Sequence, residues 1–267
     1  MTREAGFKPG LRGKRLRRQR AARSSQFVNY KPSLLRRFFT LFLHVAFKLT
    51  MRLEIVNLEN FPRSGGCIVM INHIAFLDPV IISGRFPRPV ISMAKVEAYE
   101  DKFLGPLIRV FDAFPVNRGD VDRNALRTAF DVLDGGLPLL IAPEGTRSRT
   151  ASLGEAHLGL AYIASQANVP VVPVAISGSE QWKHNVKRFR RTPIRLRIGR
   201  PFILDAGQAR VSGETLKQMT DEAMCHMASL LPPEQRGIYS NLDAATRRYL
   251  RFVGVEHLPD RSDIYER

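Results

Sequence analysis

Short apolar runs alternate with longer amphipathic stretches between residues 67 and 231, and this alternation constrains the fold more than any other feature of the chain. The expected strands are 67–72, 90–94, 114–116, 137–142, 169–176 and 194–198. The expected helices start near 78 and cover 102–111, with a break at Gly105-Pro106, then 120–134, 156–166 and 214–231. Such alternation predicts an α/β fold with a mainly parallel central sheet flanked by helices.

The chain has 267 residues, of which 44% are apolar, and this suits one large core. We expect four parts: a disordered basic arm (1–30), an amphipathic helix (31–52), an α/β domain (53–235) and a C-terminal tail (236–267). The two cysteines, Cys67 and Cys225, are far apart, have no metal-type spacing and lie in apolar segments. A disulfide is therefore not expected, and a reducing, cytosolic setting fits.

Positive charge is concentrated at the N-terminus. The formal net charge is +16, and residues 1–37 hold twelve Lys or Arg against one acid, Glu4. Such an arm binds polyanions, and composition alone does not choose between nucleic acid and the anionic face of a membrane.

Residues 34–51 are strongly apolar, with a narrow polar stripe made by Arg37, Thr40, His44 and Lys48. This spacing predicts a helix with one wide apolar face. Only ten residues separate Arg37 from Lys48, whereas a span of the hydrocarbon needs ~20. We expect a helix that lies in the membrane interface, with the basic arm on anionic lipid. Packing of this helix on the domain's own core is the alternative.

The expected catalytic residues follow the first strand of the alternating region. Ile68–Ile71 lead into Asn72 and His73, and Asp78 comes five residues later. A carboxylate within reach of an imidazole fixes its tautomer and stabilises the imidazolium, so this pair could remove a proton from a hydroxyl. A histidine that only caps the next helix is the alternative.

Other strand ends carry cations and a glycine-containing turn. Because functional groups of such sheets gather at the carboxyl ends of the strands, these residues are expected near His73. They are Lys95, Asn117-Arg118 and the run from Pro143 to Ser148. The backbone N–H groups of the run, with the Thr146 and Ser148 hydroxyls, could hold a phosphate beside Arg147.

The chain resembles the 1-acyl-sn-glycerol-3-phosphate acyltransferase family over roughly residues 52–205. The family's first motif, Asn-His-x4-Asp, is matched by Asn72, His73 and Asp78. The second is matched by Gly105 and by Phe114-Pro-Val-Asn-Arg118. The third appears as Ala142-Pro-Glu-Gly-Thr-Arg-Ser148, with Ala in place of the usual Phe, and the fourth as Val169-Pro-Val-Val-Pro-Val174. All four stand in the family's order.

The resemblance implies transfer of an acyl group from acyl-CoA or acyl-carrier protein to a lysophospholipid, giving phosphatidate from lysophosphatidate. It implies that His73 is the general base, that Asp78 orients it, and that no acyl-enzyme forms. The substrate-binding residues are then Asn72, Lys95, Arg118, Glu144, Gly145, Thr146 and Arg147. By charge alone Glu144 does not suit a phosphate, and it is expected to orient Arg147 or to accept from a glycerol hydroxyl.

No cofactor or metal is expected, since no His/Asp/Glu cluster has ligand spacing. The expected location is the cytoplasmic face of a membrane. The segment 183–200 holds eight Lys or Arg and no acid, and it could bind anionic lipid or an acidic carrier protein, or be a solvated basic face.

Two alternative functions stay open. One is the same chemistry on another lysophospholipid or a glycolipid. The other is a non-enzymatic protein that binds lipid or nucleic acid through the basic arm. Nucleic acid is not expected as a partner, because the arm has no interleaved aromatic residues on which bases could stack.

Overall fold

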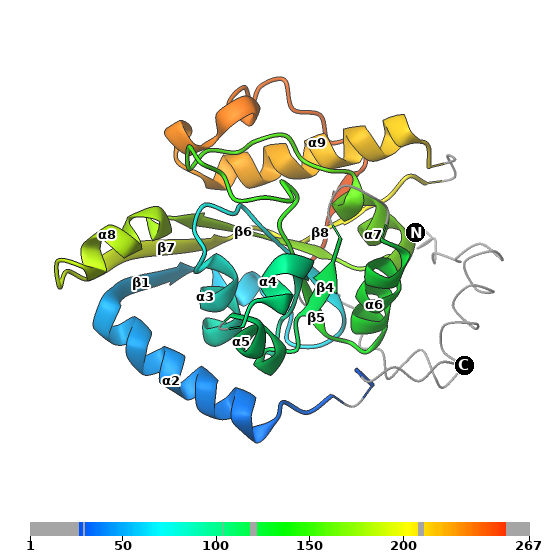
Figure 1. Ribbon diagram of the computed structural model, residues 1–267. Helices are drawn as coiled ribbons and strands as arrows, with labels where there is room; N and C mark the ends of the chain where they lie inside the picture. The colour runs from blue at the N-terminus through cyan, green and yellow to red at the C-terminus, as the bar shows by residue number, and fades with distance from the viewer. Residues whose placement is uncertain (1–26, 29, 103, 118–121, 208–210, 255–267) are drawn as a thin grey trace.

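A computed structural model describes residues 27–28, 30–102, 104–117, 122–207 and 211–254. It has a central sheet with helices on both faces (Figure 1). The strands are β1 (Met51–Val56), β2 (Cys67–Ile71), β3 (Ile91–Lys95), β4 (Phe114–Val116), β5 (Pro138–Ile141), β6 (Val171–Ser177), β7 (Thr192–Ile198), β8 (Phe202–Leu204) and β9 (Leu250–Phe252). The helices are α2 (Leu34–Thr50), α3 (Asp78–Arg85), α4 (Val96–Glu100), α5 (Leu104–Val110), α6 (Arg123–Asp134), α7 (Gly159–Ala167), α8 (Trp182–Val186) and α9 (Gly213–Leu230).

The strand order is β1-β7-β6-β2-β5-β3-β4, and β8 and β9 extend from β6 on a side branch. The five strands from β6 to β4 are mutually parallel, whereas β7 runs antiparallel to β6 and parallel to β1. The predicted mainly parallel sheet is confirmed. The carboxyl ends of β2, β5 and β6 consequently meet at one edge.

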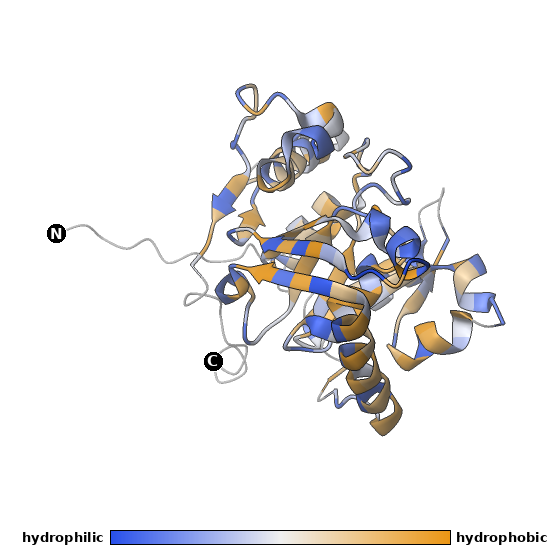
Figure 2. Ribbon diagram, turned by 90° about the vertical axis from the view of Figure 1, so that its left-hand side faces the viewer, coloured by the Kyte–Doolittle hydropathy of each residue, from blue (hydrophilic) through white to orange (hydrophobic). Residues whose placement is uncertain are grey.

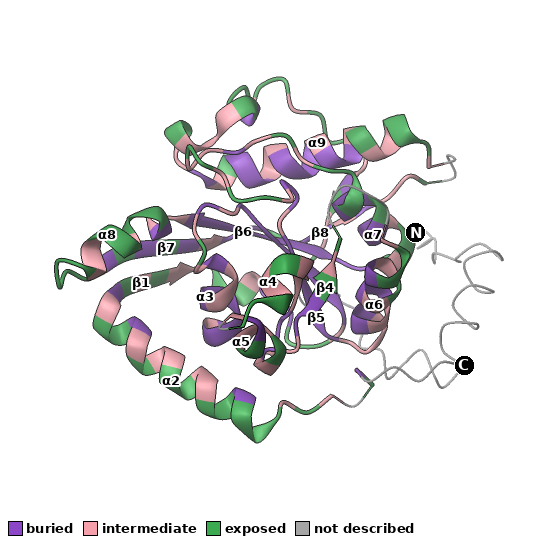
Figure 3. Ribbon diagram, in the orientation of Figure 1, coloured by how far each residue is buried: buried purple, intermediate pink, exposed green. Residues whose placement is uncertain are grey.

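Apolar residues on both faces of the sheet explain its central position. All five residues of β2 are buried between β5 and β6. One face packs on α6, α7 and α9, and the other packs on α2 and α3. The purple core of Figure 3 follows these two layers.

Three strands were not predicted. β1 follows α2 without a break, and its first two residues, Met51 and Arg52, fall inside the segment (31–52) that the sequence assigned to the helix. β8 and β9 have three residues each, too few for a recognisable alternation. β9 also shows that the sheet continues past 235, where the sequence suggested a tail.

Glu222 on α9 holds this late segment. Its buried carboxylate accepts hydrogen bonds from the Thr246 hydroxyl and from the backbone N–H groups of Arg248 and Tyr249. A second difference concerns Gly105-Pro106, which lies inside α5 rather than breaking a helix. Proline is tolerated there because first-turn N–H groups have no partner within the helix.

Helix α2 is confirmed as a helix, and it is anchored at its N-terminal end by Arg36. The buried Arg36 guanidinium donates to Tyr30 Oη (2.9 Å), to the Asp112 carboxylate (2.9 Å), and to the backbone carbonyls of Phe111 and Val90. Near the other end, the buried Phe47 ring packs against α3.

The outer face of α2 is apolar and exposed (Figure 2). Its exposed side chains are Leu34, Leu35, Phe38, Leu41, Phe42, Val45 and Leu49. The helix thus packs on the domain along one side, as the alternative prediction had it, and leaves an apolar face uncovered along the other. Contact of that face with a membrane stays a prediction. No helix within the described residues is long and apolar enough to cross a bilayer.

Candidate active site

The candidate site lies where β2, β5 and β6 end. The chain leaves β2 at Asn72-His73, turns, and enters α3 at Asp78, with Pro79 in the helix's first turn. The loop after β5 carries the run from Pro143 to Ser148, and the short helix after β6 starts at Ser179. The parallel register therefore brings together segments that are up to a hundred residues apart in sequence.

His73 and Asp78 form a hydrogen-bonded pair. His73 Nδ1 lies 3.1 Å from Asp78 Oδ2. Asp78 is fully buried, whereas the His73 side chain is 17% exposed. An imidazole that donates its Nδ1–H to a carboxylate carries its lone pair on Nε2, which makes Nε2 the proton acceptor. In this pair Nε2 of His73 is the ring nitrogen available to accept a proton, which is what the predicted general base requires.

Three further donors hold the Asp78 carboxylate. The backbone N–H groups of Ile74 and Ala75 donate to Oδ2 at 2.8 and 2.7 Å. The Ser179 hydroxyl donates to Oδ1 at 2.6 Å, and Ser179 is itself 1% exposed. A buried carboxylate is stable only when its oxygens are satisfied in this way. Ser179 was missed from the sequence; its position just beyond a strand end was the available indication.

The backbone of His73 is fixed by the loop after β5. Its N–H donates to Glu144 Oε1 (3.3 Å), and its carbonyl accepts from the Ser148 N–H (2.7 Å). The other oxygen of Glu144 accepts from the Gly154 N–H at 2.9 Å. Glu144 therefore joins the backbone of His73 to that of Gly154. Its side chain is buried, and these hydrogen bonds go to backbone groups, not to Arg147 or to a substrate hydroxyl as the sequence suggested.

Burial raises the pKa of Glu144, and this effect outweighs the hydrogen bonds from the Gly154 and His73 N–H groups and the nearby His73, all of which lower it. The neighbouring Asp78 raises it further. A carboxyl group in this position resists ionisation more than an exposed glutamate does.

Gly145 is required by its surroundings. It has a φ of 65°, and a Cβ there would lie 2.6 Å from His157 Cδ2. A side chain would therefore be strained and would also collide with the imidazole. The turn brings the backbone of residues 143–148 to the edge of the site, as the sequence predicted. The contact with His157 is a second reason why residue 145 is a glycine.

Asn72 has a different place from the one expected. Its amide is buried and pairs with the backbone of Ile176: Nδ2 donates to the carbonyl (2.8 Å), and Oδ1 accepts from the N–H (2.7 Å). These bonds join the ends of β2 and β6. Because the amide is committed to the backbone of Ile176, Asn72 holds the end of β2, from which His73 follows, against β6.

The expected phosphate-binding groups are on the surface. Thr146 and Arg147 are exposed, and Lys95 at the end of β3 is half exposed and pairs with Glu97 (2.7 Å). Arg118 lies outside the described residues. The structure therefore places Lys95 and Arg147 at strand ends of the same edge, but gives them none of the fixed geometry of His73.

Neither cysteine has the properties of a nucleophile. Burial raises the pKa of the Cys67 thiol to about 12, and burial together with Asp221 and Glu222 raises that of Cys225. Within the described residues, no three His, Cys, Asp or Glu side chains are grouped as metal ligands would be.

Known acyltransferases are similar to this chain. An acyltransferase family model matches residues 52–177. The 1-acyl-sn-glycerol-3-phosphate acyltransferase of Bacillus subtilis is 28% identical over 180 residues, which are 67% of this chain and 88% of the relative. A probable 1-acyl-sn-glycerol-3-phosphate acyltransferase of Mycoplasma pneumoniae is 29% identical over 62% of this chain and 65% of its own.

A solved structure gives the same result. The crystal structure of the 1-acyl-sn-glycerophosphate acyltransferase PlsC of Thermotoga maritima superposes with a TM-score of 0.53 and 27% identity, covering 70% of this chain and 76% of that one. The residues that the family model matches, 52–177, contain the His73–Asp78 pair and the loop after β5. In sequence and in fold, this chain is similar to 1-acyl-sn-glycerol-3-phosphate acyltransferases over roughly half to two thirds of its length.

Proposed function

We propose that the protein transfers a fatty acyl group from an acyl thioester to the free hydroxyl of 1-acyl-sn-glycerol-3-phosphate, giving phosphatidate. The observation that carries this proposal is the 3.1 Å contact between His73 Nδ1 and the buried Asp78 carboxylate. Acyl transfer to a hydroxyl needs a base for the hydroxyl proton, and the partly exposed His73 supplies it.

The reaction follows from this geometry. Nε2 of His73 takes the proton of the acceptor hydroxyl as its oxygen attacks the thioester carbonyl. Asp78 stabilises the imidazolium that forms. The tetrahedral intermediate then collapses, the C–S bond breaks, and the proton passes from the imidazolium to the leaving thiolate. No acyl-enzyme is needed, and the high pKa of the Cys67 thiol supports a direct attack.

The acceptor phosphate is assigned to Arg147 and Lys95, with the Gly145-Thr146 backbone and Arg118 as further contacts. Guanidinium groups bind phosphate oxygens in pairs, and the exposed position of Arg147 leaves its donors accessible. Acyl-CoA and acyl-carrier protein are both candidate donors, and no further cofactor enters the reaction.

The exposed face of α2 is proposed to rest on the cytoplasmic face of a membrane. Its apolar side chains lie on one side of a helix whose other side is anchored to the domain, and lysophospholipids are themselves held in a membrane. The basic N-terminal arm would add attraction to anionic lipid.

The test measures acyl transfer from palmitoyl-CoA and from palmitoyl-carrier protein to lysophosphatidate in anionic liposomes. We expect His73→Ala to lose ~10²-fold or more of the activity. His184→Ala, which changes an exposed histidine of α8, is the matched control. If the wild type transfers the acyl group only to another lysophospholipid or to a glycolipid, that lipid is the acceptor in place of lysophosphatidate. A wild type inactive on every acceptor, or an active His73→Ala, would contradict the proposal.

A further inference from the structure

The turn between α8 and β7 presents an aromatic side chain entirely to solvent. Phe189 is 101% exposed, and Arg188, Arg190 and Arg191 are its neighbours in sequence. The turn projects from the domain beyond the C-terminal end of α2 (Figure 1). Exposure of a single large apolar residue needs no explanation by itself. Two further observations make the exposure of Phe189 notable: its backbone conformation and the position of the turn in the fold.

Phe189 has an unfavourable backbone conformation as well as an unfavourable environment. Its φ is 54°, in the left-handed region where glycine is the usual residue. The surrounding bonds are those of a helix end: Phe189 N–H donates to the Val186 carbonyl (3.1 Å), and Arg190 N–H donates to the Asn185 carbonyl (2.9 Å). An aromatic residue here has a strained backbone and gains no packing within the domain.

The turn adjoins the C-terminal end of α2. Met51, which follows α2, pairs with Thr192 of β7, and the Arg191 guanidinium donates to the Met51 carbonyl at 3.0 Å. Phe189 thus precedes Thr192, the pairing partner of Met51, by three residues. Leu49, 70% exposed, is the last exposed apolar residue of α2, and the α8–β7 turn lies beyond this end of the helix (Figure 1).

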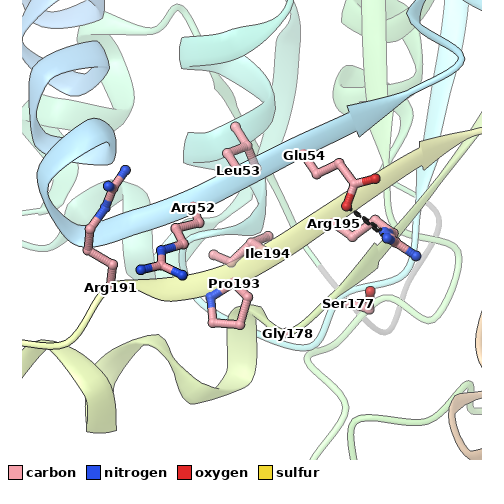
Figure 4. Close-up of a pocket in the computed structure, with 9 residues that line it drawn as sticks. All are labelled: Arg52, Leu53, Glu54, Ser177, Gly178, Arg191, Pro193, Ile194 and Arg195. Carbon is pink, nitrogen blue, oxygen red and sulfur yellow. Dashed lines mark hydrogen bonds and ion pairs between the residues drawn. The ribbon is translucent and has the colours of Figure 1, made fainter.

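A cationic groove lies behind the turn (Figure 4). It has a volume of about 580 Å³ and is lined by β1, β7 and the end of β6, with Arg52, Arg191 and Arg195 at its sides. Arg195 is paired with Glu54 at 2.9 Å. Arg52 is exposed and has no carboxylate within ion-pair distance among the described residues, so its charge is available to a ligand.

We propose that the α8–β7 turn is a second bilayer contact: Phe189 inserts into the membrane interface, while Arg188, Arg190 and the groove arginines Arg52 and Arg191 bind phosphates of anionic lipids. An aromatic ring in the interface flanked by cations at the headgroups is the arrangement that a bilayer favours. An acidic carrier protein would use the same cations, but a lone protruding ring would need a matching pocket on it. A fluid bilayer needs none.

This inference rests on the membrane location in the proposed function and adds a second point of contact to it. The test is flotation of the full chain with vesicles of phosphatidylcholine, with and without phosphatidylglycerol. Phe189→Gly should weaken binding to the anionic vesicles about tenfold, because the buried ring is lost. Its thermal unfolding temperature should not fall, since glycine suits the φ of 54°. Ile238→Gly, at another exposed apolar residue, is the matched control and should bind as the wild type does.

A tryptophan placed at 189 reports insertion directly. The chain has one tryptophan, Trp182, whose indole Nε1 is buried without a hydrogen-bond partner in the described part of the chain, so Trp182→Phe removes an unsatisfied donor. In that background, Phe189→Trp should be quenched by lipids brominated near the headgroup. Absence of quenching while the protein is vesicle-bound would overturn the insertion of residue 189.

The remaining outcomes separate the inference from the proposed function. If Phe38→Ser with Phe42→Ser abolishes vesicle binding but Phe189→Gly does not weaken it, the second contact is overturned and the α2 contact stands. If Phe189→Gly weakens binding of carrier protein and leaves vesicle binding intact, the turn binds the carrier protein and the proposed bilayer contact is overturned. If the wild type binds no vesicle, both membrane contacts fail, while transfer to a short-chain lysophosphatidate in solution still tests the chemistry.

Discussion

The two sides of the candidate site are built in opposite ways. On one side, Asp78 is fully buried and accepts hydrogen bonds from two backbone N–H groups, Ser179 and His73. On the other, Arg147 is exposed and Lys95 is half exposed and shares a surface ion pair. The first side is held by buried hydrogen bonds, whereas the side chains of the second reach into solvent.

This difference suits the roles that we propose for the two sides. A general base must be held at a defined distance from the reacting hydroxyl, because small misplacements cost large factors in rate. A phosphate site needs charge and accessible donors, and long flexible cations provide them. Changes on the fixed side should therefore alter kcat and stability together, and changes on the exposed side should alter KM alone.

The largest effect is expected for Asp78→Asn. The amide cannot satisfy the Ser179 hydroxyl, the two backbone donors and the His73 Nδ1–H at once, so the imidazole loses its orientation and its counter-charge. We expect kcat to fall by ~10³-fold and the unfolding temperature to drop. Steady-state kinetics and thermal denaturation check both. An unchanged unfolding temperature would show that the fixed side is less coupled to the fold than its contacts indicate.

The next effect is expected on the exposed side. Arg147→Ala should raise KM for the lysophospholipid about 10- to 100-fold, because charge-assisted bonds to the phosphate are lost, with little change in kcat or unfolding temperature. Arg149→Ala, two residues away and also exposed, is the control. A drop in kcat with KM unchanged would place Arg147 in the chemical step and break the contrast between the two sides.

A smaller effect is expected for Ser179→Ala. Loss of the hydroxyl that donates to Asp78 Oδ1 should lower the free energy of unfolding by ~1.5–3 kcal/mol and kcat about tenfold. Ser177→Ala, at a half-exposed neighbour, provides the comparison. If both variants behave alike, the Ser179 hydroxyl has no specific part in orienting Asp78.

The smallest effect on rate is expected for Glu144→Gln. This substitution should mainly change how the free energy of unfolding depends on pH. The wild-type carboxyl has a raised pKa, so the folded state binds its proton more tightly than the unfolded state. Its contribution to stability is therefore full below the usual glutamate pKa and declines as the pH rises through the folded pKa.

The Glu144→Gln amide does not titrate, and its NH₂ group faces one of the two backbone donors. We expect the variant to be ~1–3 kcal/mol less stable at acidic pH and the gap to the wild type to narrow as the pH rises. Urea denaturation at several pH values measures the gap. A gap that widens with pH would mean that Glu144 is stabilised in its ionised form.

The predictable parts of the fold were those with continuous local patterns. β2 is a run of five apolar residues between polar neighbours, and α6 has an Asp122 cap and a Gly135-Gly136 stop, so both are visible locally. β9 could not be found because its stability depends on pairing with β8 and on the Glu222 carboxylate. An acidic residue in an amphipathic helix looks like an ordinary surface residue.

The same distinction applies to the site. His73 and Asp78 were predictable because they lie five residues apart in one turn. The roles of Ser179, Asn72 and Glu144 depend on contacts across 71 to 104 residues of sequence, such as Glu144 to the His73 N–H and Asn72 to Ile176. Spacing along the chain carries no information on such contacts. For this reason Glu144, which bridges the His73 and Gly154 backbones, was predicted from the sequence to bind substrate.

The attachment of α2 has one more consequence. Arg36 fixes one end of the helix, and at the other end Gly84 lets the Phe47 ring come so close that an added Cβ would lie 3.1 Å from Cε2. Helix and sheet therefore turn as one rigid body. A bilayer that holds the outer face of α2 would also set the tilt of the catalytic edge. Each acceptor would then approach His73 from a constant direction, by lateral diffusion in a plane instead of a three-dimensional search.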